Sequence, residues 1–179
     1  MSTIAVLEAT ANTTQELEQI FKDHHQFVYR TAFSVTGIEA DAEDILQTIF
    51  ATLVRREIQP DLRKNPKAYL YRAAFNQSLN LIRSRKRHPT AGVEALETIA
   101  ATPASEVEEE LEKRLYEGIQ QLHEGSAQIV ILRYVHNYSV AEIAKSLGTT
   151  QSTVAVSLFR SRTRLKKLIL ASQAFGEQS

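Results

Sequence analysis

Cysteine and tryptophan are absent from this 179-residue chain, and glycine and proline are scarce, with six and four copies. Without cysteine the chain has no disulfide framework and no thiolate nucleophile. Its scattered glycines form no phosphate-binding loop, and no serine lies in a nucleophile elbow. None of the five histidines is spaced from another ligand as in a metal site. We therefore expect no catalytic residue, no metal and no cofactor, and the sequence predicts a chain that is not an enzyme.

Net charge is also absent, because 21 basic side chains balance 21 acidic ones. The charges are nevertheless segregated along the chain. Successive blocks carry −6, +8, −7 and +5 over residues 1–54, 55–88, 89–124 and 125–179. Two basic blocks separated by acidic ones predict two surfaces that face polyanions. The alternative is a set of solvated helix faces of random sign.

Long apolar runs are missing as well. No stretch approaches the roughly 18 residues of a membrane span. The first residues lack the basic start and apolar centre that are typical of a secretory signal. We therefore expect a soluble, cytoplasmic protein.

Apolar residues recur at intervals of three and four along almost the whole chain, and no alternating run is long enough for a sheet. Residues 88–105 contain two prolines, one glycine and many small side chains, which is typical of a linker. The sequence therefore predicts an all-α fold of two small helical domains. Their predicted bounds are residues 1–88 and 105–179, joined by a flexible linker at 89–104.

Capping residues mark several helix starts and one stop. Asp41 is expected to cap a helix over residues 41–56, and Asn65 with Pro66 to begin one over 66–87. Ser139 and Glu142 have the spacing of a capping box. Gly148 suits a left-handed helix stop, and Thr150 is expected to cap the helix that follows.

The predicted helix at 41–56 has two distinct faces. Its apolar half is expected in the core and consists of Ile45, Leu46, Ile49, Phe50, Leu53 and Val54. The opposite face is polar, with short side chains and little charge: Asp44, Gln47, Thr48, Ala51 and Arg55. Such a face lets another protein approach closely at little entropic cost, so it is a candidate docking face. Ordinary solvent-exposed surface is the alternative.

The predicted helix at 66–87 contains no acidic residue. Tyr69, Arg72, Asn76 and Asn80 share one face, which we name the polar stripe. Asparagine and arginine pair with base edges, and an exposed tyrosine offers a stacking surface for a base. The stripe and the basic residues after it, Arg83, Arg85, Lys86 and Arg87, are therefore candidate contacts to an unpaired DNA strand. A solvated face with a basic end favoured by the helix dipole is the alternative.

The other sides of this helix are apolar. One direction is formed by Leu70, Ala74 and Leu81. Tyr71, Phe75 and Ile82 lie beside it. We expect all of these side chains to pack inward.

Residues 138–167 have the layout of a helix-turn-helix. Ile143, Ala144 and Leu147 form the inner face of a first helix, Gly148 turns the chain, and Val154, Leu158 and Leu165 face inward on a second. Candidate contacts to duplex DNA are the hydroxyls and amide at the start of the second helix and three later arginines: Thr149, Thr150, Gln151, Ser152, Thr153, Arg160, Arg162 and Arg164. Lys166 and Lys167 extend the basic run. Each DNA module is expected to bind weakly, and the linker couples the two through effective concentration.

In this order the segments resemble a known family, the extracytoplasmic-function (ECF) sigma factors of bacterial RNA polymerase. Residues 41–56 resemble the polymerase-binding part of region 2, and residues 65–87 resemble the part that melts and reads the minus-ten promoter element. Residues 138–167 resemble region 4, which reads the minus-thirty-five element. The resemblance covers about 21–88 and 106–167, and nothing in the chain resembles regions 1 and 3.

The resemblance implies a promoter-specificity subunit that directs core RNA polymerase to promoter DNA and assists strand opening. Asp44, Gln47, Thr48, Ala51 and Arg55 would then contact polymerase, and an anti-sigma protein would control the chain. Ala155 and Ser157 stand where the family often has basic residues, and Tyr69 and Asn80 replace a frequent tryptophan and a frequent aspartate. The promoter sequence of the family is therefore not carried over. The alternative is a stand-alone helix-turn-helix regulator with an N-terminal interaction domain.

Overall fold

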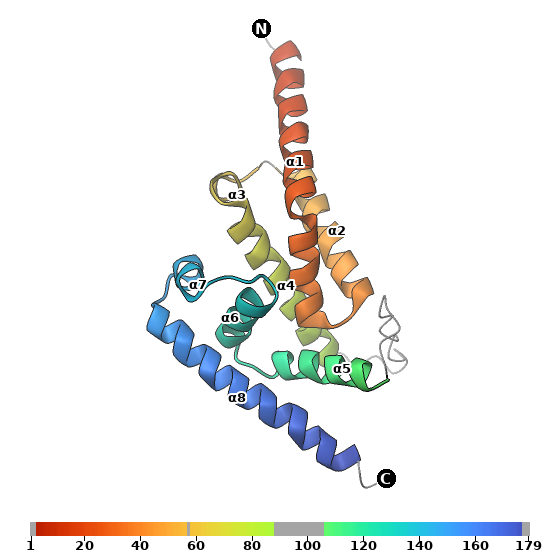
Figure 1. Ribbon diagram of the computed structural model, residues 1–179. Helices are drawn as coiled ribbons and strands as arrows, with labels where there is room; N and C mark the ends of the chain where they lie inside the picture. Colours follow the sequence, from red (N-terminus) through yellow and green to blue (C-terminus); the bar gives the residue numbers. More distant parts are fainter. Residues whose placement is uncertain (1–2, 57, 88–105, 177–179) are drawn as a thin grey trace.

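The computed structural model describes residues 3–56, 58–87 and 106–176, and the side chains of residues 13–56, 58–87 and 110–170. Within these ranges the regular elements are eight α-helices, with no strand, so the all-α prediction is confirmed (Figure 1). The helices are α1 (Thr3–Thr36), α2 (Glu39–Arg55), α3 (Pro60–Lys64), α4 (Pro66–Arg87), α5 (Glu106–Gln120), α6 (Glu124–Tyr134), α7 (Val140–Leu147) and α8 (Gln151–Gly176). None of the described helices is long and apolar enough to cross a membrane.

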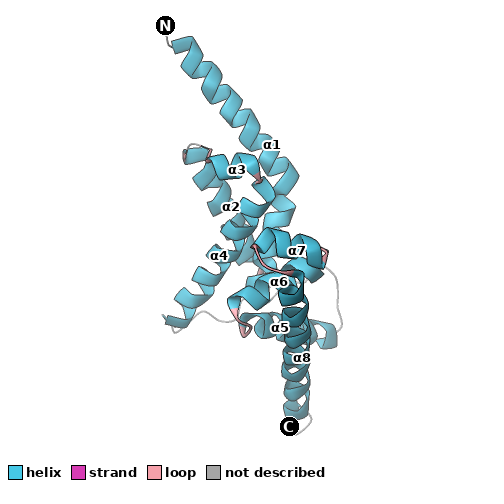
Figure 2. Cartoon of the chain, turned by 90° about the vertical axis from the view of Figure 1, so that its left-hand side faces the viewer, coloured by secondary structure: helices cyan, strands magenta, loops and turns pink. Residues whose placement is uncertain are grey.

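Helices α1–α4 form the N-terminal half of the structure. Apolar side chains spaced three and four apart turn toward one another, so Val28 of α1, Ile45 of α2 and Leu70 of α4 meet in one buried cluster. Helix α1 continues beyond this bundle toward the N-terminus, and the two ends of the chain lie at opposite ends of the molecule (Figures 1 and 2).

Helices α5–α8 form the C-terminal half. The helix-turn-helix lies at α7 and α8, and the inner-face residues Ile143, Ala144, Val154, Leu158 and Leu165 are buried as predicted. Leu147 is half-buried at the turn.

Most of the predicted caps are confirmed. The Asn65 side-chain oxygen accepts a hydrogen bond from the Ala68 amide at 3.1 Å, and Ser139 and Glu142 form the reciprocal capping box. Gly148 has φ +65°, a backbone conformation that favours glycine, and it ends α7. The Thr153 amide donates to the Thr150 hydroxyl at 3.2 Å at the start of α8.

The prediction for Asp41 was wrong. Helix α2 begins two residues earlier, at Glu39, and the residue at its N-cap, Ile38, provides no side-chain hydrogen bond. Asp41 therefore lies inside the first turn, and its carboxylate turns toward α4 instead of capping the helix.

The two halves are docked on each other. Val35 of α1 and Tyr71 and Phe75 of α4 are buried in the same apolar cluster as Ile119 of α5 and Ile131 of α6. The sequence predicted two modules tethered by a flexible linker, and it gave no sign of this shared cluster. The predicted linker at 89–104 and the domain limits beside it lie outside the described residues.

Candidate functional site

The candidate docking face on α2 is exposed. Its members all lie on the solvent side of the helix: Asp44, Gln47, Thr48, Ala51 and Arg55. The opposite side is buried as predicted, except that Leu46 is half-buried and Val54, near the end of the helix, is 71% exposed. The sequence predicted Val54 in the core. This prediction was wrong, because Val54 lies on the accessible surface.

Three members of the polar stripe are exposed on α4, namely Arg72, Asn76 and Asn80. Tyr69 is half-buried, because its ring packs against the apolar cluster of the N-terminal half. The sequence predicted an exposed tyrosine, and the structure leaves only part of this ring available for stacking. The inward sides of α4 are as predicted: Leu70, Tyr71, Ala74 and Phe75 are buried, and Leu81 and Ile82 are half-buried.

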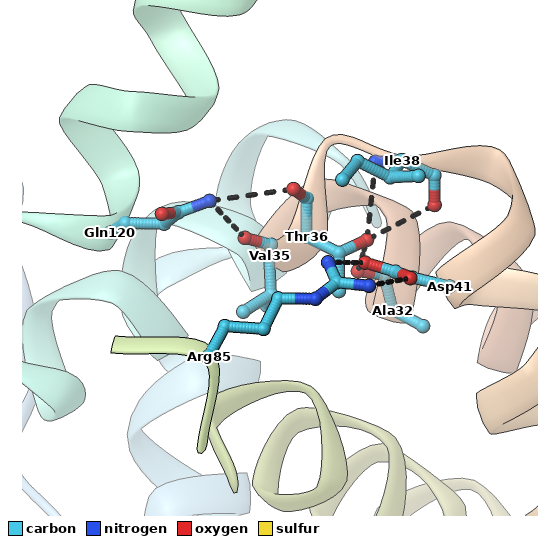
Figure 3. Close-up of polar contacts among 7 residues, drawn as sticks. All are labelled: Ala32, Val35, Thr36, Ile38, Asp41, Arg85 and Gln120. Carbon is cyan, nitrogen blue, oxygen red and sulfur yellow. Dashed lines mark hydrogen bonds and ion pairs between the residues drawn. The ribbon is translucent and has the colours of Figure 1, made fainter. Parts of the chain in front are cut away.

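Two of the four basic side chains at the end of α4 pair with acidic residues of other helices. The Arg83 guanidinium donates to the Glu124 carboxylate of α6 at 3.0 Å, and Arg85 binds both carboxylate oxygens of Asp41, one of them at 2.6 Å. Figure 3 shows Arg85 reaching from α4 to Asp41 at the start of α2. Lys86 and Arg87 are exposed like the other two, and the Arg87 guanidinium donates to the Arg83 carbonyl on the same helix at 3.4 Å. Arg85 therefore joins two helices and is not free to contact DNA in this conformation.

We expect Arg85→Ala to lower the free energy of unfolding by roughly 1–3 kcal/mol, because it leaves a buried carboxylate without its hydrogen-bond donors. The Asp41 side chain is only 7% exposed, whereas that of Arg85 is 45% exposed. Arg87→Ala, an exposed neighbour in the last turn, should change stability by less than about 0.5 kcal/mol. Urea unfolding followed by circular dichroism measures both. Equal stabilities for the two variants would contradict a structural role for Arg85.

The start of α8 presents polar groups to solvent. The Thr150 hydroxyl lies 3.0 Å from the Ser152 hydroxyl and 2.8 Å from that of Thr153, so these three side chains share one hydrogen-bonded cluster. Gln151 is exposed beside them, and Thr149 is half-buried. Because the first amides of a helix lack intrahelical acceptors, this end of α8 offers donors to a phosphate.

The basic residues of α8 point in two directions. At 100° per residue, Arg160, Arg164 and Lys167 lie on one side, and Arg162 and Lys166 on the other. The Arg162 guanidinium is hydrogen-bonded to the Tyr134 hydroxyl and lies 5.4 Å from the centre of that ring. Arg160 and Arg164 are exposed on the side of the helix away from Arg162. They are therefore the better placed candidates for DNA contact.

Several partners of the predicted residues were not identified from the sequence. Asp41, Glu124 and Tyr134 engage three of the candidate arginines from positions 44, 41 and 28 residues away. A periodic pattern reports only neighbours on one helix, so no sequence signal indicated these pairs. Among the described residues no group of three or more histidine, cysteine or acidic side chains is arranged to hold a metal ion.

Both halves of the chain match models of known protein families. The model of sigma-70 region 2 matches residues 20–88, and that of sigma-70 region 4 matches residues 112–165. The first match includes α2 and α4 with their exposed polar faces. The second includes the helix-turn-helix of α7 and most of α8.

Two proteins with similar sequences are both named ECF RNA polymerase sigma factors. The ECF RNA polymerase sigma factor SigM of Mycobacterium tuberculosis is 28% identical over 152 residues, which cover 85% of this chain and 76% of the relative. The corresponding factor SigW of Bacillus subtilis is 26% identical over 164 residues, covering 85% and 86% of the two chains.

Two solved structures share the fold. A structure of CnrH in complex with the cytosolic domain of CnrY has a TM-score of 0.61 at 21% identity, over 94% of this chain and 96% of that one. A structure of the sigma factor RpoE in complex with the anti-sigma factor NepR from Bartonella quintana has a TM-score of 0.56 at 22% identity, over 87% and 97%. With both conserved regions matched in order, the chain belongs to the sigma-70 family and, within it, to the ECF sigma factors.

Proposed function

We propose that this ECF sigma factor divides its work between its two halves. The N-terminal half binds core RNA polymerase through the exposed face of α2 and the opened minus-ten strand through α4. The C-terminal half binds the duplex minus-thirty-five element through the start of α8. The observation that carries the proposal is the match to regions 2 and 4 in order, on helices whose candidate contact faces are largely exposed.

The chemistry of the surfaces supports this division. Arg72, Asn76 and Asn80 form an exposed face on a helix without acidic residues, which suits contact with a nucleic-acid strand. The exposed face of α2 is polar and sparsely charged, which suits a protein partner better than a polyanion. The stand-alone regulator is not favoured, because the N-terminal half matches region 2 and not an unrelated interaction domain.

Polymerase performs the catalysis in this proposal, and the chain contributes promoter selection and no chemical step. The protein acts in the cytoplasm, where polymerase and template are located. An anti-sigma protein is a further proposed partner, because the similar structure of RpoE was solved with the anti-sigma factor NepR.

The proposal is tested by run-off transcription with purified core RNA polymerase and genomic promoter fragments, with and without the chain. Specific transcripts that require the chain support it. Transcription of the same promoters by a holoenzyme with another sigma factor, modulated by this chain, would instead identify a stand-alone regulator. Core polymerase that binds the chain but yields no specific transcript on any fragment would contradict promoter selection.

The polar stripe is expected to act on opened DNA and not on duplex. Asn76→Ala and Asn80→Ala each remove an exposed amide. A good bidentate pair to a base is worth about 1–3 kcal/mol, so strand opening should fall by roughly tenfold or more. Permanganate reactivity of thymines near the start site measures opening, and footprinting of the upstream element measures recruitment, which should change little.

Gln121→Ala serves as the matched control for the stripe, because it removes an exposed amide from the turn after α5. It should leave both steps at the wild-type level. Wild-type opening in both stripe variants would show that the stripe is ordinary surface.

A further inference from the structure

The loop between α6 and α7, residues 135–139, anchors the C-terminal half on the N-terminal half. The His136 ring lies with its centre 4.1 Å from that of Phe27 and 6.1 Å from that of Tyr71. Its Nε2 atom is 2.8 Å from the Thr31 hydroxyl. Beside it, Arg30 donates to the Val135 carbonyl at 3.2 Å. A histidine of one half therefore occupies an aromatic pocket of the other.

The hydrogen bonds around Thr31 indicate where the proton of His136 lies. The Thr31 hydroxyl donates its single proton to the Phe27 carbonyl at 2.8 Å. In its hydrogen bond with His136, the Thr31 hydroxyl oxygen must therefore be the acceptor. Nε2 of His136 then carries a proton and is the donor. Nδ1 is the atom that would take up a second proton and make the ring cationic.

The surroundings oppose that second proton. The Lys67 ammonium lies 5.0 Å from the centre of the Phe27 ring and 4.9 Å from that of Tyr138, and so caps the pocket with a positive charge. Burial, followed by the charges of Arg30 and Lys67, lowers the pKa of His136 from 6.5 to about 4.

Titratable and charged groups face this pocket from each packed element. On α1 it is Arg30, on α4 they are Lys67 and Tyr71, and in the loop it is Tyr138. Around them, His24 of α1 and Glu142 of α7 lie close enough to Lys67 to interact with its charge, and Arg133 of α6 donates to the Tyr138 carbonyl at 2.8 Å. Burial lowers the pKa of His24 as well. Glu142 is the acidic residue of this set, and its carboxylate is engaged by the Ser139 amide and hydroxyl at 2.8 and 2.7 Å.

We propose that His136 is an acid-releasable latch: its neutral ring holds the C-terminal half on α1 and α4, and a second proton on Nδ1 releases that half. The contacts of His136 lie within this chain, so the latch does not depend on the proposed function. Other contacts across the interface also hold the two halves together. The Tyr71 hydroxyl donates to the Gln128 carbonyl at 3.0 Å. The Gln120 amide donates to the Val35 carbonyl at 3.1 Å, as Figure 3 shows.

The direction of the pH effect follows from the two states of His136. In the undocked chain the ring has its ordinary pKa of 6.5, and in the docked chain its pKa is about 4. Docking is therefore fully present above pH 6.5 and is lost as the pH falls toward 4. The docking equilibrium constant should drop about tenfold between pH 8 and pH 5.5.

The absence of cysteine makes the latch measurable, because a single introduced thiol reports one position. Val35→Cys places the thiol under the docked C-terminal half, at a residue that is 1% exposed. Its rate of reaction with dithiodipyridine, divided by that of an exposed Ala40→Cys at the same pH, follows the undocked fraction. We expect this ratio to rise about tenfold from pH 8 to pH 5.5. A ratio that does not change with pH would overturn the proposal.

Three variants assign the response. In a His136→Gln background, which keeps a neutral hydrogen-bond donor, the ratio of the two thiol reaction rates should no longer depend on pH. The ratio itself can be low or high, depending on how well glutamine replaces the ring. In a His24→Gln background the rise should persist. Ala32→Cys, buried in the cluster of the N-terminal half, should show no comparable rise. A rise that survives His136→Gln, vanishes with His24→Gln, or appears equally at Ala32→Cys would show that the latch is not His136.

Discussion

Phe75→Ala is expected to lower the free energy of unfolding by about 3–5 kcal/mol, the usual cost of removing a buried aromatic ring. The Phe75 side chain is 0% exposed, and it packs with Tyr71 in the cluster shared by both halves. Domains of ordinary stability unfold at roughly 5–15 kcal/mol, so the loss is a large share of the total. Urea unfolding followed by circular dichroism measures it.

Phe75→Ala should also change the shape of the unfolding curve. Because Phe75 contacts both halves, its removal should weaken their docking, and unfolding should separate into two transitions. Asn76→Ala changes the next, exposed residue of α4 and should stay within about 0.5 kcal/mol of the wild type. A change of less than 1 kcal/mol for Phe75→Ala would contradict the position of this ring in the core.

Gln47→Ala combined with Arg55→Glu is expected to reduce binding to core RNA polymerase by at least about tenfold, because a residue at the centre of an interface contributes about 2 kcal/mol or more. Both side chains are exposed on α2, so the melting temperature should change little. Affinity for immobilised core polymerase and the yield of promoter-specific transcript measure the effect.

A matched control makes the same change of charge elsewhere. Lys113→Glu with Gln121→Ala alters exposed residues in and after α5. This control should bind polymerase as the wild type does. If both double variants lose affinity equally, the effect is one of net charge, and the exposed face of α2 is not the contact.

The local features of the fold were predictable, because their causes lie within a few residues of each other. Asn65, Ser139 with Glu142, Gly148 and Thr150 each use a short-range hydrogen bond or a backbone preference that the sequence displays. The inward sides of α4 follow from the periodicity of its apolar residues in the same way.

Contacts between distant segments were not predictable by this reasoning. Asp41 has the residue type of a cap, but the nearby Arg85 guanidinium and an earlier helix start give its carboxylate another role. Tyr69 lies in a polar stripe, yet the ring is large enough to reach the cluster beneath it. His136 had no signal beyond its residue type, because the aromatic residues of its pocket, Phe27 of α1 and Tyr71 of α4, lie at least 65 residues earlier in the chain.

Helix α4 has a consequence for how such proteins diversify. Leu70 and Ala74 pack within the N-terminal half, whereas Tyr71 and Phe75 pack against the C-terminal half. The buried sides of this helix are therefore constrained by two neighbours at once. The halves of paralogous chains are not freely interchangeable parts, because a recombined gene would join an α4 surface to α5 and α6 surfaces that had not evolved beside it.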